Sequence, residues 1–529
     1  MKNSKKTLLM ALSIAINCAI QTAAADTILR RGNGVEPKGI DPQTSEGTAE
    51  ANIMRDLFEG LLARDRDINL IPGIAEKWDI SADGKTYTFH LRDAKWSDGT
   101  PLTAHDFVYA WQRDVNPATG SKYSFLLYPV KNARALTEGQ SSNFDQLGIK
   151  ALDEHTLQIE LEAGTPYFLE LLSHPTTYPV PKHIVEKHGK NWTRTENIVT
   201  NGAYTLKNWQ PNAQMTLAKS DTYWDKNNVK IDQVIYYPTE DQNTELKRYR
   251  AGELDLTFVI PLDQIKWLRE NLQDELKIGP YLGTYFFGYN LTRPPFKDNP
   301  KLREALTLAI DRDIITGKIT GTGEKPVYGI VPPGIAGYDN YRPAYADLSQ
   351  KEREEKARQL YAEAGYGKDK PLKVELLYNT SEGHKKIAIA IAAMWKKTLG
   401  VEVQLVNQEW KVFLATRQEK ATTEAFRSGW IGDYNDPNSF LELFTAKAGM
   451  NDPGYNSAKY DELLQQAAHE QDPAKRAALL KEAEQELIDS YAVAPIYSYV
   501  TKRLVKPYVK GYSANILDEN PSKHLSIEK

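Results

Sequence analysis

Cysteine is almost absent from this sequence of 529 residues, and its single example, Cys18, lies within the first 25 positions. A chain without cysteine beyond that point has no disulfide, no thiol nucleophile and no thiolate metal ligand. Its stability must therefore come from hydrophobic cores, and 529 residues are enough to build two or three of them.

A surplus of positive charge is also missing. The formal net charge is −4 at pH 7, and charged residues make up 26% of the chain. Because nucleic-acid-binding proteins carry basic surfaces, this balance predicts no nucleic-acid partner. The hydrophobic content of 41% is typical of a soluble globular protein.

Long hydrophobic runs are confined to the N-terminus. Three lysines near the start precede an apolar stretch at Leu8–Ile20, and the alanines at 23–25 provide small residues for cleavage. This pattern is typical of a secretory signal peptide, so we expect residues 1–25 to be removed. The residue before Cys18 is not small, which disfavours lipidation of this cysteine. A cysteine-free chain with an export signal and no later membrane-spanning run predicts a protein of the bacterial periplasm.

Hydrophobic periodicity predicts a mixed α/β protein. Strands are expected at Thr27–Asn33, Thr86–Leu91, Leu157–Leu161, Val234–Tyr237, Leu256–Val259, Leu282–Tyr289, Leu372–Leu377, Val401–Leu405 and Ala494–Val500. Helices are expected at Glu50–Leu62, Phe107–Arg113, Pro166–Leu172, Leu302–Ile315, His384–Leu399 and Lys475–Ser490. The strand–helix–strand order around His384–Leu399, with Gly400 as the helix C-cap, predicts a right-handed α/β unit. Strands both early and late indicate that the chain leaves one lobe and returns to it.

The stretch Arg427–Phe440 carries the clearest binding chemistry. Asp433 lies between glycine and tyrosine, shortly after Trp430 and before a turn. A carboxylate in this setting can hold a cation by charge-assisted hydrogen bonds, which strengthen when water is excluded. Arg427 could bind an anion. We therefore predict that this stretch holds the amino end of a peptide, although an aspartate beside a turn is more often only a turn residue.

Several ordered blocks resemble the periplasmic oligopeptide-binding proteins, which are the large solute receptors of ABC peptide importers. The blocks are RDLFEGL at 55–61, PGIAEKW at 72–78, KWSDGTP at 95–101, DFVYAW at 106–111, LYNTS at 377–381 and NQEWK at 407–411. The similarity covers essentially the whole chain after the leader. It implies a three-lobed α/β periplasmic binding protein, with a cleft between two main lobes that are joined by two hinge strands.

The lobes that the resemblance implies divide the chain unevenly. Lobe I is expected to be discontinuous and to combine residues 26–58, 183–284 and 500–529. Lobe II is expected at 59–182 and lobe III at 285–499.

The resemblance also implies roles for individual residues. Asp433 is expected to bind the peptide ammonium, with Glu46 near the peptide backbone; taken alone, Glu46 would be a solvated loop acid. The expected backbone-pairing positions are Thr48, Tyr123, Gly429 and Ile431. The cations expected to meet the peptide carboxylate are Arg427, His384 and Arg417. A family position that is lysine in some members is Thr320 here, which puts binding of the shortest peptides in doubt.

Physical chemistry supports this assignment. A receptor for varied peptides must recognise what all of them share, namely the ammonium, the carboxylate and the backbone amides. Trp410 and Trp430 could line roomy side-chain pockets, although tryptophan is more often part of a core. Without the resemblance, His384 at a helix start would be a surface or cap residue.

An enzymatic function is not supported by the sequence. The sequence contains no Gly-x-Ser-x-Gly elbow, no available cysteine and no cluster of metal ligands, so we predict a binding protein that is not an enzyme and has no metal or cofactor. Its expected partners are peptides of roughly two to five residues, together with a membrane permease and its ATPase, and a monomer is expected.

Two alternatives lie within the same family. The murein-peptide branch, which binds cell-wall tripeptides, resembles this chain around His384 and Asp433 as well. Glu46 favours the general oligopeptide branch, because the murein branch tends to lose that acid. A receptor for dipeptides or heme is a third and more distant possibility.

Overall fold

The computed structural model describes residues 27–335 and 337–529. The predicted signal peptide, residues 1–25, and Cys18 lie outside the described residues. Within the described part of the chain, no helix combines the length and the apolar character needed to cross a membrane.

The first sheet gathers strands from two distant parts of the sequence. Its spatial order is β1 (Ile28–Gly34), β12 (Gln233–Pro238), β11 (Gln214–Lys219) and β10 (Tyr204–Gln210). The strand β1 runs parallel to β12, whereas β10, β11 and β12 are antiparallel. Apolar side chains of this sheet and of helix α1 (Thr48–Leu57) enter the largest hydrophobic core. The N-terminal strand is thus fixed beside a segment far away in sequence.

The second sheet is antiparallel, in the order β4 (Ala75–Ile80), β5 (Thr86–Leu91), β9 (Thr156–Glu160) and β8 (Ile149–Ala151). Along β5, buried and half-buried residues alternate, as the sequence pattern predicted. The helices of this region are α2 (Ala104–Asp114), α3 (Ala133–Thr137), α4 (Phe168–Leu171) and α5 (Lys182–His188). Thr103 and Asp106 form the capping box that begins α2.

The third sheet has six strands. Their order is β14 (Lys325–Pro326), β18 (Val493–Leu504), β13 (Leu276–Tyr289), β17 (Ala425–Ile431), β15 (Lys373–Asn379) and β16 (Glu402–Gln408). The strands β15 and β16 are parallel and are connected by helix α11 (Glu382–Leu399), which ends at Gly400 in the left-handed conformation. The predicted strand–helix–strand unit is therefore present, with its predicted C-cap.

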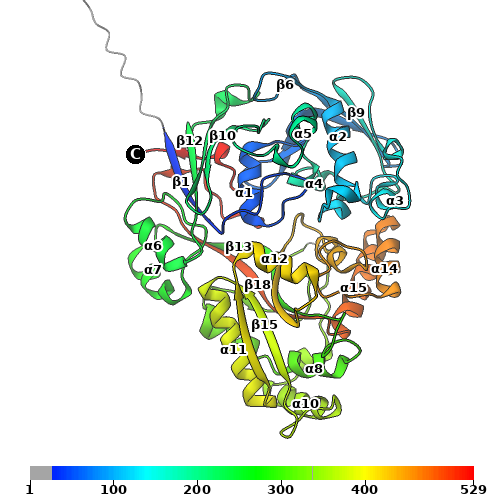
Figure 1. Cartoon of the computed structure of the whole chain (residues 1–529), viewed down its shortest axis with the longest axis vertical. Helices are drawn as coiled ribbons and strands as arrows, with labels where there is room; N and C mark the ends of the chain where they lie inside the picture. Colours follow the sequence, from blue (N-terminus) through cyan, green and yellow to red (C-terminus); the bar gives the residue numbers. More distant parts are fainter. Residues whose placement is uncertain (1–26, 336) are drawn as a thin grey trace, which may run out of the picture.

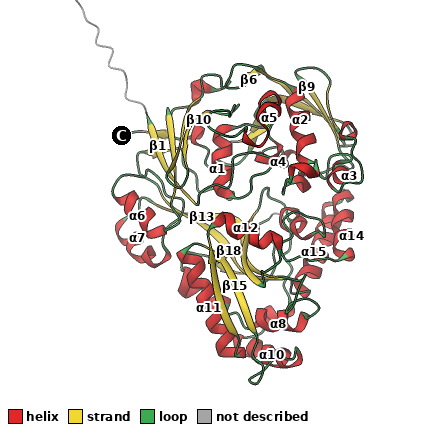
Figure 2. Cartoon of the chain, in the orientation of Figure 1, coloured by secondary structure: helices red, strands yellow, loops and turns green. Residues whose placement is uncertain are grey.

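The remaining elements are short or cover the sheets, as Figure 2 shows. Three two-stranded ladders join β2 (Leu62–Arg64) to β3 (Leu70–Pro72), β6 (Ala94–Lys95) to β7 (Pro101–Leu102), and β19 (Val509–Lys510) to β20 (Ser526–Ile527). The other α-helices are α6 (Gln242–Arg250), α7 (Ile265–Asn271), α8 (Pro300–Leu308), α9 (Arg312–Ile314), α10 (Gln350–Glu363), α12 (Trp410–Glu419), α13 (Asn438–Leu441), α14 (Ala458–His469) and α15 (Pro473–Asp489).

Two long strands, β13 and β18, run from the lower part of the molecule towards the upper part in Figure 1. They pair antiparallel from Leu276 opposite Leu504 to Gly288 opposite Val493, and the register shifts between Pro280 and Thr284. At this interruption Leu282 bonds instead to the C-terminal segment and to Gly432. The fold is thus an α/β fold in which two long strands run between the lower and upper parts of the molecule.

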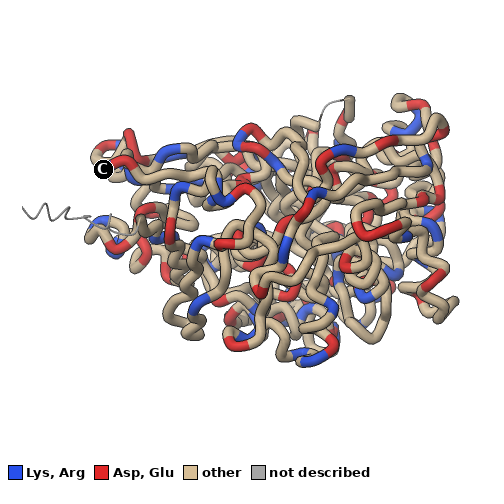
Figure 3. The backbone as a smooth tube through the Cα atoms, turned by 90° about the horizontal axis from the view of Figure 1, so that it is seen from above, with Lys and Arg blue, Asp and Glu red and all other residues tan. Residues whose placement is uncertain are grey.

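The three larger sheets draw on different parts of the predicted lobes. The strands of the first sheet fall in the ranges expected for lobe I, and those of the second sheet fall in 59–182. The strands β13 and β18 cross the predicted boundaries at 284 and 499. The boundaries themselves stay predictions. Basic and acidic residues are interspersed along the whole tube in Figure 3, in keeping with the nearly balanced charge.

Three predicted elements were wrong in extent or type. The helix expected at Glu50–Leu62 ends at Leu57, because Phe58 is extended and Asn201 and Gly202 bond the chain at this point. The strand expected at Leu256–Val259 is only an isolated bridge at Leu256. The helix expected at Leu302–Ile315 is interrupted after α8, because Asp311 caps a new helical turn.

Candidate functional site

A cavity of about 380 Å³ lies between the lobes, and its walls come from all parts of the chain. The predicted binding residues all line this cavity: Glu46, Thr48, Tyr123, His384, Arg417, Arg427, Gly429, Trp430, Ile431 and Asp433. Thr320 and Trp410 line it too. This volume is within the usual range for a small-ligand site. The fold therefore brings together residues that are separated by hundreds of positions, while their contact with a ligand stays a prediction.

The strand β17 presents an open edge to the cavity. One of its edges pairs with β13 over its whole length, from Gly283 opposite Ile431 to Tyr289 opposite Ala425. On the other edge, β15 pairs only with Ala425 and Phe426. Within the described residues, no strand covers this second edge beyond Phe426. An extended peptide can add to such an edge through main-chain hydrogen bonds.

Gly429, in the middle of this edge, is required for close approach. A Cβ atom there would lie 2.4 Å from the hydroxyl of Tyr499 and 3.1 Å from Nη2 of Arg427. Any larger residue would push these two groups away from the strand. The glycine therefore allows the arginine and the tyrosine to fold back over the backbone of β17.

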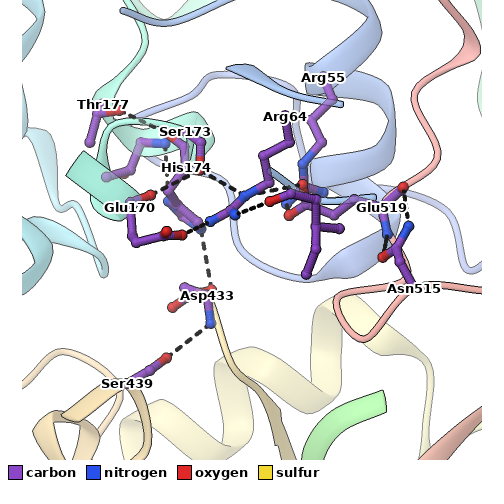
Figure 4. Close-up of polar contacts among 12 residues, drawn as sticks. Arg55, Arg64, Glu170, Ser173, His174, Thr177, Asp433, Ser439, Asn515 and Glu519 are labelled. Atoms are coloured by element: carbon purple, nitrogen blue, oxygen red, sulfur yellow. Dashed lines mark hydrogen bonds and ion pairs between the residues drawn. The ribbon is translucent and has the colours of Figure 1, made fainter. Parts of the chain in front are cut away.

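Asp433 follows β17 and defines an acidic end of the cavity (Figure 4). Its side chain is 11% exposed, and Oδ1 lies 3.4 Å from Nε2 of His174. Its backbone N–H donates to Oγ of Ser439 at 2.9 Å, which fixes the turn. The other carboxylate oxygen, Oδ2, is buried and has no hydrogen-bond partner. A buried carboxylate oxygen without a donor is costly, so this atom is available to a cation from outside.

His174 comes from the opposite side of the cleft and was not predicted from the sequence. Its Nδ1 accepts a hydrogen bond from the backbone N–H of Thr176 at 3.3 Å. In the neutral ring this leaves the proton on Nε2, which faces Asp433. The His174 ring also lies 4.8 Å from the ring of Tyr123, which stacks on Trp430 at 5.9 Å. The histidine thus orients the aspartate and closes one wall of the cavity.

The charged groups beyond His174 neutralise one another. Arg55 donates to Glu519 at 2.5 Å, and Arg64 donates to Glu170 at 2.6 Å. Figure 4 shows these pairs beside His174, above Asp433 in the view. Both arginines are already paired with other carboxylates. The carboxylate that lies within ion-pair distance of His174 is that of Asp433.

Glu46 is buried, which corrects the expectation of a solvated loop acid. It is 3% exposed, and its carboxylate accepts hydrogen bonds from Nζ of Lys38 at 2.9 Å and from Nε2 of Gln418 at 3.0 Å. Gln418 belongs to α12, so this contact crosses the cleft. Nearby, burial raises the pKa of Glu50 to about 7. Burial therefore disfavours the charged form of Glu50, which lies next to Trp410, whereas Glu46 is paired with Lys38.

Arg427 defines the opposite, cationic end. Its guanidinium donates to Oδ1 of Asn379 at 3.3 Å and to the hydroxyl of Tyr499 at 2.6 Å. It also lies 4.8 Å from the centre of the Tyr285 ring. Among the described residues, no carboxylate forms an ion pair with Arg427, and its Nε is buried without a partner. A buried guanidinium surrounded by neutral groups is prepared for an anion.

His384 lies beside Arg427 rather than on the surface. Ser381 caps α11 and accepts the backbone N–H of His384, and the imidazole lies 5.6 Å from the Tyr285 ring. Burial, followed by the charges of Arg427 and Lys502, holds the pKa of His384 well below its usual range. In the empty site the ring is therefore neutral near pH 7, and its expected role as a partner of a peptide carboxylate stays a prediction.

Arg417 is less available than Arg427. It forms an ion pair with Asp452 at 2.6 Å, and Nη1 donates to Oγ of Ser428 at 3.1 Å. Both side chains of the pair are less than 10% exposed, at 9% and 6%. A ligand carboxylate at Arg417 would have to share the guanidinium with Asp452.

Besides His174, two further residues of the site escaped prediction, Tyr499 and Lys502. Both belong to β18 and line the cavity. A signal was present, since Lys502 and Arg503 stand near the end of a strand that is otherwise uncharged. For His174 the local sequence carries no such signal, because its partner Asp433 belongs to a distant part of the chain.

Comparisons with known proteins give one consistent result. The family model described as "Bacterial extracellular solute-binding proteins, family 5 Middle" matches residues 69–452. The periplasmic oligopeptide-binding protein OppA of Escherichia coli is 46% identical over 98% of this chain and 96% of its own length. The crystal structure of Haemophilus influenzae OppA in complex with RPPGFSPFR has a TM-score of 0.93 at 39% identity, covering 96% of this chain and 100% of that one.

The murein tripeptide-binding protein MppA of E. coli is a further relative and informs on conformation. One structure of MppA has a TM-score of 0.93 at 40% identity, covering 96% of this chain and 99% of that one. An unliganded open form of MppA has a TM-score of only 0.65, although 95% and 98% of the two chains are covered. The lobes of the present structure are thus not arranged as in that open form. The chain belongs to family 5 of the bacterial extracellular solute-binding proteins.

Proposed function

We propose that this protein is a periplasmic receptor of an ABC importer that captures short peptides by both of their charged ends. Asp433 binds the ammonium, and Arg427 binds the carboxylate with His384 beside it. The open edge of β17 pairs with the peptide backbone in between. Glu46, Thr48 and Tyr123 complete the opposite wall.

The observation that carries the proposal is the pair of unsatisfied charges at the two ends of one open strand edge. Oδ2 of Asp433 lacks a donor, and the Arg427 guanidinium lacks a carboxylate among the described residues. The extended chain between them spans about 20 Å, and the two side chains shorten this gap. Since an extended peptide covers about 3.3–3.6 Å per residue, peptides of roughly three to five residues match the spacing.

The aromatic lining supports tolerance of varied side chains. Trp430, Trp410 and Tyr123 offer flat apolar surfaces that do not demand a particular hydrogen-bonding pattern. Recognition then rests on the parts that every peptide shares, and water can satisfy polar side chains of the ligand.

The relatives also support the transport role. OppA and MppA of E. coli are named as periplasmic binding proteins. We propose that this chain likewise acts in the periplasm as a monomeric receptor without catalytic activity. Closure around a peptide would present the closed form to a membrane permease and its ATPase, because ligand contacts to both lobes favour the closed state.

Calorimetry with defined peptides tests the proposal. The protein is unfolded and refolded to remove bound peptides, then titrated with trialanine, N-acetyl-trialanine and trialanine amide. We expect trialanine to bind with a Kd at or below the micromolar range, and each blocked peptide to bind at least tenfold more weakly. Equal affinity for all three peptides, or binding of none by a folded protein, would contradict the proposal.

A murein tripeptide is the second candidate ligand, supported by the similarity to MppA. Glu46 favours the general oligopeptide role, since it is retained and buried at the cavity. Competition between trialanine and the murein tripeptide decides between the two. We expect trialanine to displace the murein peptide at comparable concentration, whereas a preference of a hundredfold or more for the murein peptide would support the alternative.

A further inference from the structure

Lys502 places a second cation in the wall of the cavity. It lies near the end of β18, and its side chain is 15% exposed. Its charge acts on His384 together with that of Arg427, so the three groups belong to one neighbourhood. The function proposed above does not use this lysine.

An acid from a separate loop holds Lys502 in place. Nζ of Lys502 forms an ion pair with Oε1 of Glu324, whose side chain is completely buried, and it donates to Oγ1 of Thr322 at 3.3 Å. Glu324 also accepts hydrogen bonds from the hydroxyl and the backbone N–H of Thr322, at 2.5 and 3.1 Å. The loop is fixed beside β18 because Lys325 in β14 pairs with Ser498.

This arrangement leaves the lysine with a spare donor. An ammonium group carries three N–H bonds, and two of them are directed at Glu324 and Thr322. Glu324 is already satisfied by three hydrogen bonds, so it can hold the lysine while a second anion approaches from the cavity. The lysine is thus oriented at a fixed point of the wall.

The sheet register places Lys502 towards the acidic end. Both β17 and β18 run antiparallel to β13, so they run in the same direction as each other. Arg427 lies opposite Phe287, near the start of β17, whereas Lys502 lies opposite Ile278, near the end of β18. Asp433 follows the end of β17. Along the strands, Lys502 is therefore displaced from Arg427 in the direction of Asp433. It reaches about the level of Asp433, because Trp430 and Ser498 both pair with Thr284.

From this geometry we propose that Lys502, oriented by Glu324, is the carboxylate partner for peptides too short to reach Arg427. The inference rests on the peptide-binding function proposed above and deepens it. Thr320 carries no charge and so cannot supply this cation. Its buried hydroxyl also donates to the backbone oxygen of Thr316 at 3.1 Å. A cation from β18 makes up for the missing lysine at position 320, so the receptor accepts dipeptides as well as longer peptides.

The test compares dipeptides with pentapeptides in Lys502→Met. Dialanine, pentaalanine and their C-terminal amides are titrated into the stripped protein by calorimetry. We expect Lys502→Met to weaken binding of dialanine at least tenfold and to change binding of pentaalanine by less than threefold. The preference of the wild type for dialanine over its amide should disappear in the variant. Lys502→Arg, which keeps the charge, should retain most of the dialanine affinity.

Control variants separate charge at the cavity from folding. Glu324→Gln keeps the lysine and should leave dialanine binding unchanged or tighter. The double variant Lys502→Met with Glu324→Gln leaves no buried unpaired acid, and it should still lose affinity for dialanine. Equal changes for both peptide lengths, or a wild type that binds pentaalanine but not dialanine, would overturn the proposal for Lys502 and leave the function standing. A folded wild type that binds no peptide would overturn both.

Discussion

The two ends of the cavity use different means to hold a charge ready. At the acidic end, Asp433 is met by His174 from the other side of the cleft, and one carboxylate oxygen stays free. At the cationic end, Arg427 contacts only neutral partners. The second cation of the same sheet, Lys502, is displaced towards Asp433 and has an acid of its own. The acidic end therefore depends on lobe closure, and the cationic end is built largely within one sheet.

This difference assigns distinct tasks to the two ends. A ligand group at Asp433 has to fit between two lobes, so recognition of the ammonium is coupled to closure. Two cations at different levels of the third sheet, Arg427 and Lys502, would allow the carboxylate to be met at more than one distance. The acidic end would thus fix where a peptide begins, and the cationic end would decide which lengths are accepted.

Loss of the acidic anchor should have the largest effect. Asp433→Ala is expected to weaken binding of trialanine by about 2–5 kcal/mol, the scale for breaking a desolvated charge pair. Calorimetry measures the change, and thermal unfolding of the empty protein checks the fold. N-acetyl-trialanine is the matched control, because its affinity should differ little between wild type and variant. An unchanged affinity for trialanine would contradict the role of Asp433.

Loss of the cationic anchor should have the next largest effect. Arg427→Met keeps an apolar stem but removes the guanidinium. It should weaken binding of trialanine by about 1.5–3 kcal/mol, the scale for a hydrogen bond to a charged group. The variant should bind trialanine amide about as well as the wild type does. If calorimetry shows that trialanine and trialanine amide lose affinity equally in the variant, the arginine acts on the fold and not on the carboxylate.

The orienting histidine should matter less. His174→Leu removes the contact to Oδ1 of Asp433. It is expected to weaken the binding of all peptides with a free ammonium by about 0.5–1.5 kcal/mol. His174→Gln, which keeps a donor, should recover part of this loss. A matched titration with N-acetyl-trialanine should show no difference between the two variants, and a large difference there would argue against orientation of Asp433.

The smallest effect concerns pH and distinguishes the ends again. Because the pKa of His384 is held well below its usual range in the empty protein, the unfolded chain binds a proton below about pH 6.5 that the folded chain does not. Acidification should therefore lower the Tm of the empty wild type more than that of His384→Gln. A bound carboxylate offsets the nearby cations and raises this pKa, so binding in mildly acidic buffer should take up a proton.

Calorimetry in buffers of different ionisation enthalpy measures that proton uptake. We expect it with trialanine, and we expect less of it with trialanine amide or in His384→Gln. Proton uptake that is identical for the acid and the amide would place the titrating group away from the carboxylate end.

Much of the fold followed from local patterns. The strand at Thr86–Leu91 and the helix that ends at Gly400 were predicted because alternation and helical spacing are properties of neighbouring residues. The break after α8 and the missing strand at Leu256 depend on distant partners, which periodicity does not report. The spatial order of the strands in the six-stranded sheet was not predicted and is known only from the structure.

The candidate site shows the same division. Asp433 and Arg427 stand in one short stretch and could be found together, and the resemblance supplied their roles. The burial of Glu46 and the contact of His174 with Asp433 arise where lobes meet, and no local pattern encodes them. The lowered pKa of His384, in helix α11, likewise results from burial and from two cations on the distant strands β17 and β18.

The most direct test is the crystal structure of the stripped protein in complex with trialanine. The account predicts an extended ligand against the free edge of β17, with its ammonium at Oδ2 of Asp433 and its carboxylate at Arg427, beside His384. A peptide bound in the reverse direction, or one whose ammonium lies away from Asp433, would contradict the account.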